Sequence, residues 1–204
     1  MHHPLSAHTA LLICDMQNDF LHPSGAYARG GVSLDARPIL AAQQAAIGAV
    51  RAVGGVVIAT RFTLVPGRDG APMVAPHLKA MRPFLRAGDF AVGSFGHDTL
   101  AELGPMDGAV DKIAFSAFYQ TRLEWLLRKF EVHDVVIAGI VTNGGVASTA
   151  RDAHVRDFGV TILSDGCAAF RPSVHEEALA GLAPVARITP TAALLGVDSS
   201  FALR

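Results

Sequence analysis

Residues 135–158, VVIAGIVTNGGVASTARDAHVRDF, join a short apolar run, an Asn-Gly-Gly turn and a helical pattern. The apolar run at 135–138 is typical of a buried parallel strand. In the turn, Asn143 is suited to cap the helix, and the paired glycines allow the backbone to approach a ligand closely. The unpaired N–H groups of a helix N-terminus favour an anionic or polarised oxygen. The stretch therefore predicts a strand, a turn with a ligand site, and a helix; an ordinary βα turn is the alternative interpretation.

The same alternation of strand and helix patterns recurs on both sides of this unit. Apolar runs predict strands at 9–15, 55–60, 109–115, 135–141, 159–164 and 185–188, with helical patterns between them. We therefore expect an α/β fold: a single domain spanning 1–204, with a doubly wound sheet of about six mainly parallel strands and helices on both faces. Residues 61–103, rich in proline and glycine, predict an irregular excursion that serves as a lid or an oligomer contact.

The composition favours extensive burial and gives no sign of a nucleic-acid or membrane partner. Hydrophobic residues make up 50% of the 204 residues and charged residues 17%, and the mean hydropathy is +0.35. We expect a homo-oligomer, a dimer or a tetramer. The formal net charge is −1 and no basic stretch is interleaved with aromatic residues, which argues against nucleic acid and membrane surfaces. No apolar run is long enough to span a bilayer, and Met1 to Pro4 do not begin a secretory signal, so we expect a cytoplasmic protein.

Two charged residues interrupt apolar strands and are candidates for chemistry. Asp15 ends the first predicted strand, where α/β sheets place their ligands, although a carboxylate there can also cap a loop. Lys112 lies inside the third predicted strand and must either reach solvent or meet a carboxylate. With Asp15 on a neighbouring strand, the two can be buried as a pair, in which Asp15 is an acid or a base. Tyr27 and Arg29, in an irregular loop, are either ligand contacts or solvated.

Other candidates for nucleophiles and metal ligands are weak. Cys14 and Cys167 lie in or just after apolar runs and are interpreted as small hydrophobic residues. His77 and His97 show no metal-ligand spacing and are interpreted as surface residues. The sequence therefore predicts a small-molecule site without metal or cofactor.

Three motifs in a fixed order span nearly the whole chain. They are D-x-Q-N-D-F at 15–20, K-x-x-x-S-A-F at 112–118, and G-x-x-T-N-x-x-V-x-x-T-A-R-D-A at 139–153. Together they resemble the isochorismatase-like hydrolase superfamily, which includes nicotinamidases, N-carbamoylsarcosine amidohydrolases and ureidoacrylate hydrolases. The third motif resembles the stretch that carries the nucleophile of the cysteine-dependent members.

The chain departs from those cysteine-dependent members at Gly145. They carry the nucleophilic cysteine there, whereas true isochorismatases carry glycine. Without a thiolate no acyl-enzyme forms, and Ser148 and Thr149 lie about a turn further along the helix, pointing elsewhere. The resemblance to isochorismatases implies that Asp15 protonates the substrate and that water attacks the resulting cation. It also implies that Lys112 holds Asp15 and an anionic group of the substrate.

The resemblance further implies a set of substrate contacts and a non-proline cis peptide bond. The cis bond is expected at Ile140–Val141, where it would aim the Val141 N–H at a substrate oxygen beside the Gly145 N–H. Residues 61–63 stand where zinc-binding nicotinamidases carry an Asp-x-His pair, which again implies no metal. The residues expected to bind the substrate are Phe20, Arg61, Phe118, Val141, Thr142, Asn143 and Gly144.

Two enzyme hypotheses and one binding hypothesis remain open. Phe62 stands where the family's isochorismatases carry glutamine, and Asn143 where they carry histidine, so Thr142-Asn143 is closer to the amidohydrolases. The first hypothesis is acid-catalysed hydrolysis of an isochorismate-type enol ether, and the second is direct attack of water on an amide or ureido C–N bond. The third is a catalytically silent binding protein. A glycine introduced at 145 in place of a native cysteine is a further interpretation.

Overall fold

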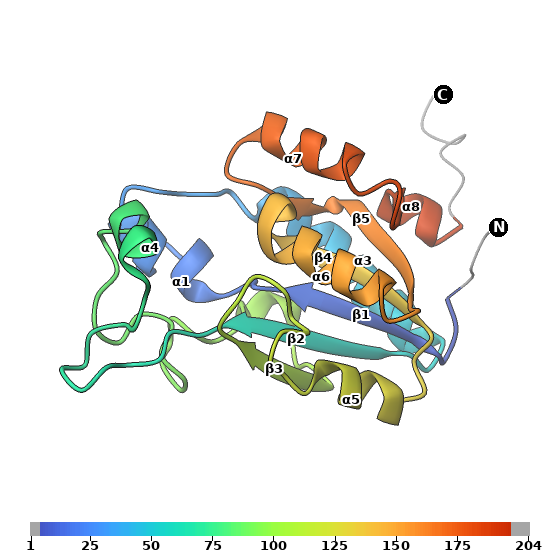
Figure 1. Ribbon diagram of the computed structural model, residues 1–204. Coiled ribbons are helices and arrows are strands. Elements are labelled where there is room, and N and C mark those ends of the chain that lie inside the picture. The colour runs from blue at the N-terminus through green and yellow to red at the C-terminus, as the bar shows by residue number, and fades with distance from the viewer. Residues whose placement is uncertain (1–4, 197–204) are drawn as a thin grey trace.

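The computed structural model describes residues 5–196, so both ends of the predicted domain 1–204, including Met1 to Pro4, lie outside the described residues. Within that range six strands form one sheet in the order β3-β2-β1-β4-β5-β6, and every neighbouring pair is parallel. This confirms the predicted α/β fold with its central parallel sheet (Figure 1). The strands are β1 Thr9–Cys14, β2 Val56–Phe62, β3 Gly108–Lys112, β4 Asp134–Ile140, β5 Gly159–Ala168 and β6 Arg187–Thr189.

Helices cover both faces of the sheet, and the central strands β1 and β4 are buried on both sides. In β1, Leu11 and Ile13 pack on one face with α3, and Leu12 and Cys14 pack on the other with α5 and α6. Figure 1 shows α5 and α6 in front of the sheet and α3 behind it. The helices are α1 Asn18–Leu21, α2 Ala26–Arg29, α3 Arg37–Ala52, α4 Pro76–Met81, α5 Leu123–Lys129, α6 Ala147–His154, α7 Pro172–Ala180 and α8 Thr191–Leu194. The short turns are η1 Ala101–Leu103 and the π-helical turn η2 Thr142–Val146.

The strand order places a crevice between the carboxyl ends of β1 and β4. The chain leaves β1 toward β2 and β3, then crosses to β4 on the opposite side, and ligands of open α/β sheets bind where the order reverses in this way. Gly139 of β4 lies beside Cys14 with φ of +121°, and a Cβ built on it would lie 2.1 Å from the Cys14 carbonyl oxygen. Only glycine therefore allows β4 to approach β1 this closely, next to Asp15.

The segment between β2 and β3, residues 63–107, is the irregular excursion that the sequence predicts. It contains α4 and η1, and Figure 1 shows α4 beyond the carboxyl ends of the strands. The prediction that His97 lies on the surface is wrong: it is 1% exposed, and its Nε2 lies 2.9 Å from Thr63 Oγ1. His97 is buried because the excursion folds back on itself, a long-range contact that its local sequence does not encode.

The strand ends differ most from the predicted ones in β3 and β5. β3 stops at Lys112 instead of residue 115, so Ile113 and Phe115 leave the sheet and are more than half exposed. β5 continues to Ala168 instead of ending at residue 164, with a register shift against β4. No helix in residues 5–196 is long and apolar enough to span a membrane.

Candidate active site

A cavity of about 320 Å³ lies at the carboxyl ends of β1, β3 and β4. The turn η2 forms its floor on the β4 side, and the excursion contributes the opposite wall. The volume is in the range typical of small-molecule sites. The lining residues are Asp15, Phe20, Tyr27, Phe62, Met81, Arg82, Lys112, Phe115, Ile140, Val141, Asn143, Gly144, Gly145 and Phe170.

A buried ion pair stands at the base of this cavity. Lys112 Nζ lies 2.7 Å from Asp15 Oδ2, and the two residues are 1% and 5% exposed. The Thr60 hydroxyl donates to Asp15 Oδ1 over 3.3 Å, and Lys112 Nζ also donates to the Ala114 carbonyl oxygen over 3.1 Å. Because the pair is satisfied by hydrogen bonds and by its opposite charge, both groups can remain in an otherwise apolar sheet end.

The surroundings of Asp15 shift its titration to higher pH. Burial raises the pKa of the Asp15 carboxyl, while the Lys112 ammonium and the Thr60 hydroxyl act in the opposite direction without overcoming it. Asp15 therefore holds a proton at a higher pH than an exposed aspartate does. Such a carboxyl is suited to give a proton to a substrate or to take one from water.

Gly145 faces this carboxyl directly. A Cβ built on Gly145 would lie 2.9 Å from Asp15 Oδ2 and 3.3 Å from the Ile140 carbonyl oxygen, closer than carbon contacts normally come. The space beside Gly145 is thus taken by the Asp15 carboxylate. None of the described lining residues is a cysteine, serine or threonine.

The two cysteines are buried away from the cavity, as expected for small hydrophobic residues. Both thiols are in the core beneath α5 and α6. Burial raises the pKa of the Cys14 thiol to about 12, so it is a poor source of thiolate. The hydroxyl of Thr149 accepts a hydrogen bond from the Ala117 N–H over 3.0 Å and so holds the segment that follows β3.

The turn after β4 agrees with the prediction in one respect and differs in another. The peptide bond Ile140–Val141 is cis, which confirms the expected non-proline cis bond. The predicted helix cap at Asn143 is wrong: its side chain makes no capping hydrogen bond, because the chain enters α6 through the π-helical turn η2. Asn143 is instead exposed and lines the cavity.

The structure brings most of the predicted site residues to this one cavity. Asp15, Lys112, Gly145 and four of the expected substrate contacts, Phe20, Val141, Asn143 and Gly144, all line it. Three other expected contacts do not line it: Arg61, Phe118 and Thr142.

Each of these three exceptions has a local cause. Phe118 packs in the core against Phe158, with ring centroids 6.1 Å apart. Arg61 lies on the opposite side of β2 from the cavity and pairs with Asp111 over 2.8 Å. Thr142 is fully buried behind the turn, where its hydroxyl lies 2.8 Å from His175 Nδ1.

The sequence did not predict most of the wall that faces η2. Phe62, Met81, Arg82, Phe115 and Phe170 come from the end of β2, the excursion, the segment after β3 and the end of β5. Phe62 ends β2, and Phe115 lies inside the K-x-x-x-S-A-F motif just after β3; their closeness to strand ends is the signal that could have identified them. Arg82 and Met81 carry no such signal because their position depends on how the excursion folds.

The two candidate contacts in the loop between β1 and α3, Tyr27 and Arg29, have different surroundings. Tyr27 lines the cavity, and burial raises the pKa of its hydroxyl, with the hydrogen-bonded Arg82 guanidinium acting in the opposite direction. Arg29 instead pairs with Asp89 over 2.5 Å. Within residues 5–196 no three His, Cys, Asp or Glu side chains are grouped as metal ligands are, and the metal-free site stays a prediction.

The residues that follow Asp15 in the first motif attach the excursion to the sheet. Gln17 Nε2 donates to the carbonyl oxygens of Phe62 and His97 over 3.0 Å each, and Gln17 Oε1 accepts the Phe62 N–H over 2.7 Å. The Asp19 carboxylate accepts the N–H groups of Ala26 and Phe90 over 2.9 and 2.6 Å. The motif thus supplies one reactive carboxyl and several side chains that hold the opposite wall.

Comparisons with known proteins agree with this arrangement. The isochorismatase domain matches residues 9–193. The ureidoacrylate amidohydrolase RutB of Pantoea ananatis (strain LMG 20103) is 32% identical over 182 residues, which cover 83% of this chain and 73% of that protein.

Solved structures with the same architecture include a cysteine hydrolase and an isochorismatase family protein. The cysteine hydrolase from Pseudomonas syringae pv. phaseolicola 1448A has a TM-score of 0.79 and 26% identity, with 97% of this chain and 98% of that chain covered. The isochorismatase family protein from Desulfovibrio vulgaris subsp. vulgaris str. Hildenborough has a TM-score of 0.75 and 28% identity, with 93% and 97% covered. With the domain matched over almost its whole length and the predicted motifs converging on one cavity, this chain belongs to the isochorismatase family of hydrolases.

Proposed function

We propose that this hydrolase cleaves a small anionic substrate by attack of water, with no covalent enzyme intermediate. Asp15 transfers the proton, and Lys112 positions Asp15 and offsets negative charge. The observation that carries the proposal is the buried Asp15–Lys112 pair facing Gly145, in a cavity whose described lining has no cysteine, serine or threonine. A described lining that has no thiol or aliphatic hydroxyl but has a buried carboxyl with a raised pKa suits acid or base catalysis.

The first candidate substrate is an isochorismate-type enol ether. Protonated Asp15 gives its proton to the methylene carbon of the enolpyruvyl group, which leaves a cation stabilised by the ether oxygen. Water adds to the cationic carbon, the one bonded to the ether oxygen, and returns a proton to the Asp15 carboxylate. The resulting hemiketal breaks into pyruvate and an alcohol. One carboxyl suffices for this sequence, and the raised pKa of Asp15 favours its first step.

The second candidate is a ureido or amide compound, which the 32% identity to a ureidoacrylate amidohydrolase specifically favours. In this reaction ionised Asp15 takes a proton from water as the water attacks the carbonyl carbon. The N–H groups of Val141 and Gly145 are the proposed donors to the developing oxyanion. Asp15 then gives the proton to the leaving nitrogen, and ammonia or an amine departs.

The two candidates differ in their products and can be separated in one screen. The purified protein is incubated with isochorismate, and pyruvate is followed; parallel reactions with ureidoacrylate and small amides follow ammonia. We expect release of one of these products, with no mass added to the intact protein during turnover. An acyl adduct on the protein would contradict water attack, and silence on both panels would favour the binding-protein hypothesis. A homo-oligomer, a cytoplasmic location and the absence of a cofactor stay predictions.

A further inference from the structure

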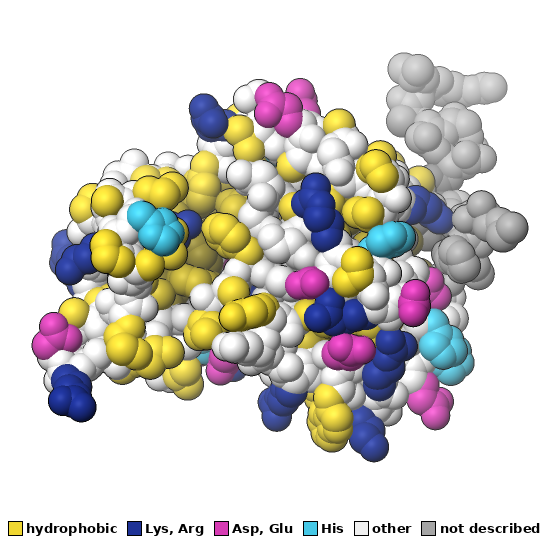
Figure 2. All heavy atoms as spheres, in the orientation of Figure 1, with side chains coloured by type: hydrophobic (Ala, Val, Ile, Leu, Met, Phe, Trp, Pro, Cys, Tyr) yellow, Lys and Arg dark blue, Asp and Glu magenta, His cyan; other side chains and the backbone are white. Residues whose placement is uncertain are grey.

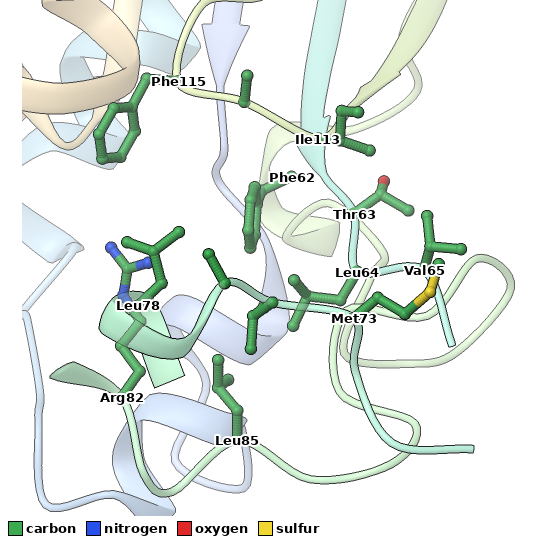
Figure 3. Close-up of a pocket in the computed structure, with 13 residues that line it drawn as sticks. Phe62, Thr63, Leu64, Val65, Met73, Leu78, Arg82, Leu85, Ile113 and Phe115 are labelled. Carbon is green, nitrogen blue, oxygen red and sulfur yellow. The ribbon is translucent and has the colours of Figure 1, made fainter. Parts of the chain in front are cut away.

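A second cavity of about 470 Å³ opens beside the active-site cavity. The two share Phe62, Arg82 and Phe115 as lining residues, so they adjoin each other at these three side chains. Figure 3 shows Phe62 and Phe115 on one side of the second cavity and α4, with Leu78 and Arg82, on the other. A ligand bound at Asp15 can therefore extend past Phe62 without leaving the protein surface.

The walls of the second cavity are mainly apolar, and Thr63 and Arg82 are their polar side chains. The walls are formed by the excursion and by the residues after β3, including Leu64, Leu78 and Ile113. Met73, Ile113 and Phe115 are more than half exposed, and Figure 2 shows apolar side chains gathered over this part of the surface. Exposed apolar side chains around a hollow favour an apolar ligand.

Arg82 is the charged residue at the junction of the two cavities. It follows the last residue of α4, is half-buried, and contacts the Tyr27 hydroxyl. Among residues 5–196 no Asp or Glu is within ion-pair distance of it, whereas Arg29, Arg37 and Arg61 each have such a partner. A half-buried guanidinium without a carboxylate partner is suited to bind an anionic group of a ligand.

We infer that the substrate is an amphiphilic anion: its carboxylate pairs with Arg82, and an apolar alkyl or aryl substituent fills the second cavity. The reacting bond lies in the first cavity beside Asp15. The inference deepens the proposed function, on which the description of this ligand as a substrate rests. It assigns Arg82 as a positioning residue and the second cavity as the part of the site that selects the substituent.

The shared border of the two cavities favours this occupant over a second copy of the chain. A protein surface laid over the exposed residues would cover the mouth of the active-site cavity, because Phe115 and Arg82 border both spaces. A substituent of the substrate fills the second cavity and leaves the first one in use.

The inference is tested by binding and does not require turnover. The probes are straight-chain carboxylates from butyrate to octanoate, titrated calorimetrically into the wild-type protein. We expect affinity to rise roughly two- to fourfold per added methylene, the gain that burial of a CH₂ group gives. Octanamide, the neutral analogue, should bind about tenfold or more weakly than octanoate, because it lacks the charge-assisted hydrogen bonds.

Matched variants separate the two parts of the site. Ala75→Trp adds bulk to the second cavity, and the chain-length dependence should disappear; Ala80→Trp, on an exposed position of α4 outside the cavity, should retain it. Arg82→Leu should remove the preference for octanoate over octanamide, and Arg86→Leu should keep it. Circular dichroism confirms that each variant is folded.

Affinity that does not change with chain length, as when a second copy covers the cavity, would overturn the inference. So would a chain-length dependence that survives in Ala75→Trp. These experiments measure binding alone, so they can be interpreted even if the turnover screen finds no product. A binding series without the expected trend would overturn the inference about the ligand but would not bear on the water-attack mechanism.

Discussion

The cavity wall formed by the strand ends differs from the wall formed by the excursion in how its side chains are held. Asp15 and Lys112 are buried and fixed by an ion pair and by hydrogen bonds to neighbouring strands. On the opposite wall, Met81 and Phe115 are more than half exposed, and Arg82 has no carboxylate partner among the described residues. Residues that transfer protons need fixed positions, whereas residues that select a substrate can lie on variable loops.

Gln17 and Asp19 connect these two walls. Their side chains follow Asp15 immediately and hold the backbone of Phe62, His97 and Phe90 in the opposite wall. One motif therefore fixes both the reactive carboxyl and the distance to the wall that faces it. Substitutions at the strand ends should affect the chemistry and the fold, and substitutions in the excursion should affect mainly substrate affinity.

The largest effect is expected for Asp15→Asn, which removes the transferable proton and nearly preserves the shape of the side chain. Turnover of the substrate found in the screen should fall by about 10²- to 10⁴-fold, the usual contribution of a positioned acid or base. The control is Asp111→Asn, which changes the partly exposed carboxylate next to Lys112 on β3. Equal turnover by Asp15→Asn and wild type in steady-state assays would remove Asp15 from the mechanism.

Lys112→Met tests how strongly the strand-end wall depends on its ion pair. Loss of the ammonium leaves a buried carboxylate unpaired, and the free energy of unfolding should fall by about 3–5 kcal/mol. Because burial raises the pKa of Asp15 in the folded state, folding binds a proton, and the stability that this contributes is lost as the pH rises through that pKa. The loss of unfolding free energy in Lys112→Met should therefore grow with pH.

Urea denaturation of Lys112→Met and Arg61→Met compares the loss of a buried ion pair with the loss of a partly exposed one. Arg61 pairs with Asp111 over 2.8 Å, nearly the same distance, but with about a third of each side chain exposed. Its loss should cost about 1 kcal/mol or less. Similar losses in the two variants would show that burial does not distinguish the two pairs.

Gly145→Ala should lower turnover by about tenfold through a steric effect on Asp15. The new Cβ would lie 2.9 Å from Asp15 Oδ2 and would push the carboxylate from its position, and misplacement of a catalytic group slows the chemical step. Gly48→Ala is the matched control, because Gly48 is exposed within α3 and its Cβ would have no neighbour within 4 Å. That change should leave turnover intact and stabilise the fold by roughly 0.5–1 kcal/mol. Unchanged kinetics in Gly145→Ala would contradict the tight fit between Gly145 and the carboxylate.

The smallest effect is expected for Phe62→Leu, at the end of β2, on the cavity wall that faces η2. The ring contacts Phe20 and Phe90 and borders both cavities, and leucine keeps an apolar side chain there. We expect KM to rise a few-fold with kcat nearly unchanged, because the change alters substrate binding and leaves Asp15 in place. A fall in kcat as large as that of Asp15→Asn would show that the two walls do not divide their roles.

The strand-end wall could be predicted from the sequence, whereas the excursion wall could not. Asp15 ends one apolar run and Lys112 interrupts another, and the topology of a parallel sheet brings the ends of β1 and β3 to the same edge. The glycine turn after β4 was recognisable for the same reason. These predictions needed only local patterns and the order of the strands.

Prediction from the sequence fails for residues whose positions depend on long-range contacts. The local sequence of His97 predicts a surface position, because nothing near it in the chain reveals the contacts with Gln17 and Thr63. Phe118 belongs to a motif whose family resemblance implies a substrate contact, but the chain turns after Lys112 and directs the ring into the core. No local pattern identifies Arg82, because its position depends on the path of the whole excursion.

The central claim is that Asp15, with its raised pKa, transfers the proton without a covalent intermediate, and the pH dependence of kcat/KM tests it most directly. For an enol ether Asp15 must be protonated, so kcat/KM should fall tenfold per pH unit above a pKa higher than the ordinary value of about 3.9. For a ureido or amide substrate Asp15 must be ionised, and kcat/KM should rise through that same pKa. A profile that is flat above pH 4, or that follows the titration of a thiol near pH 8 to 9, would contradict the assignment of Asp15 as the proton-transferring group.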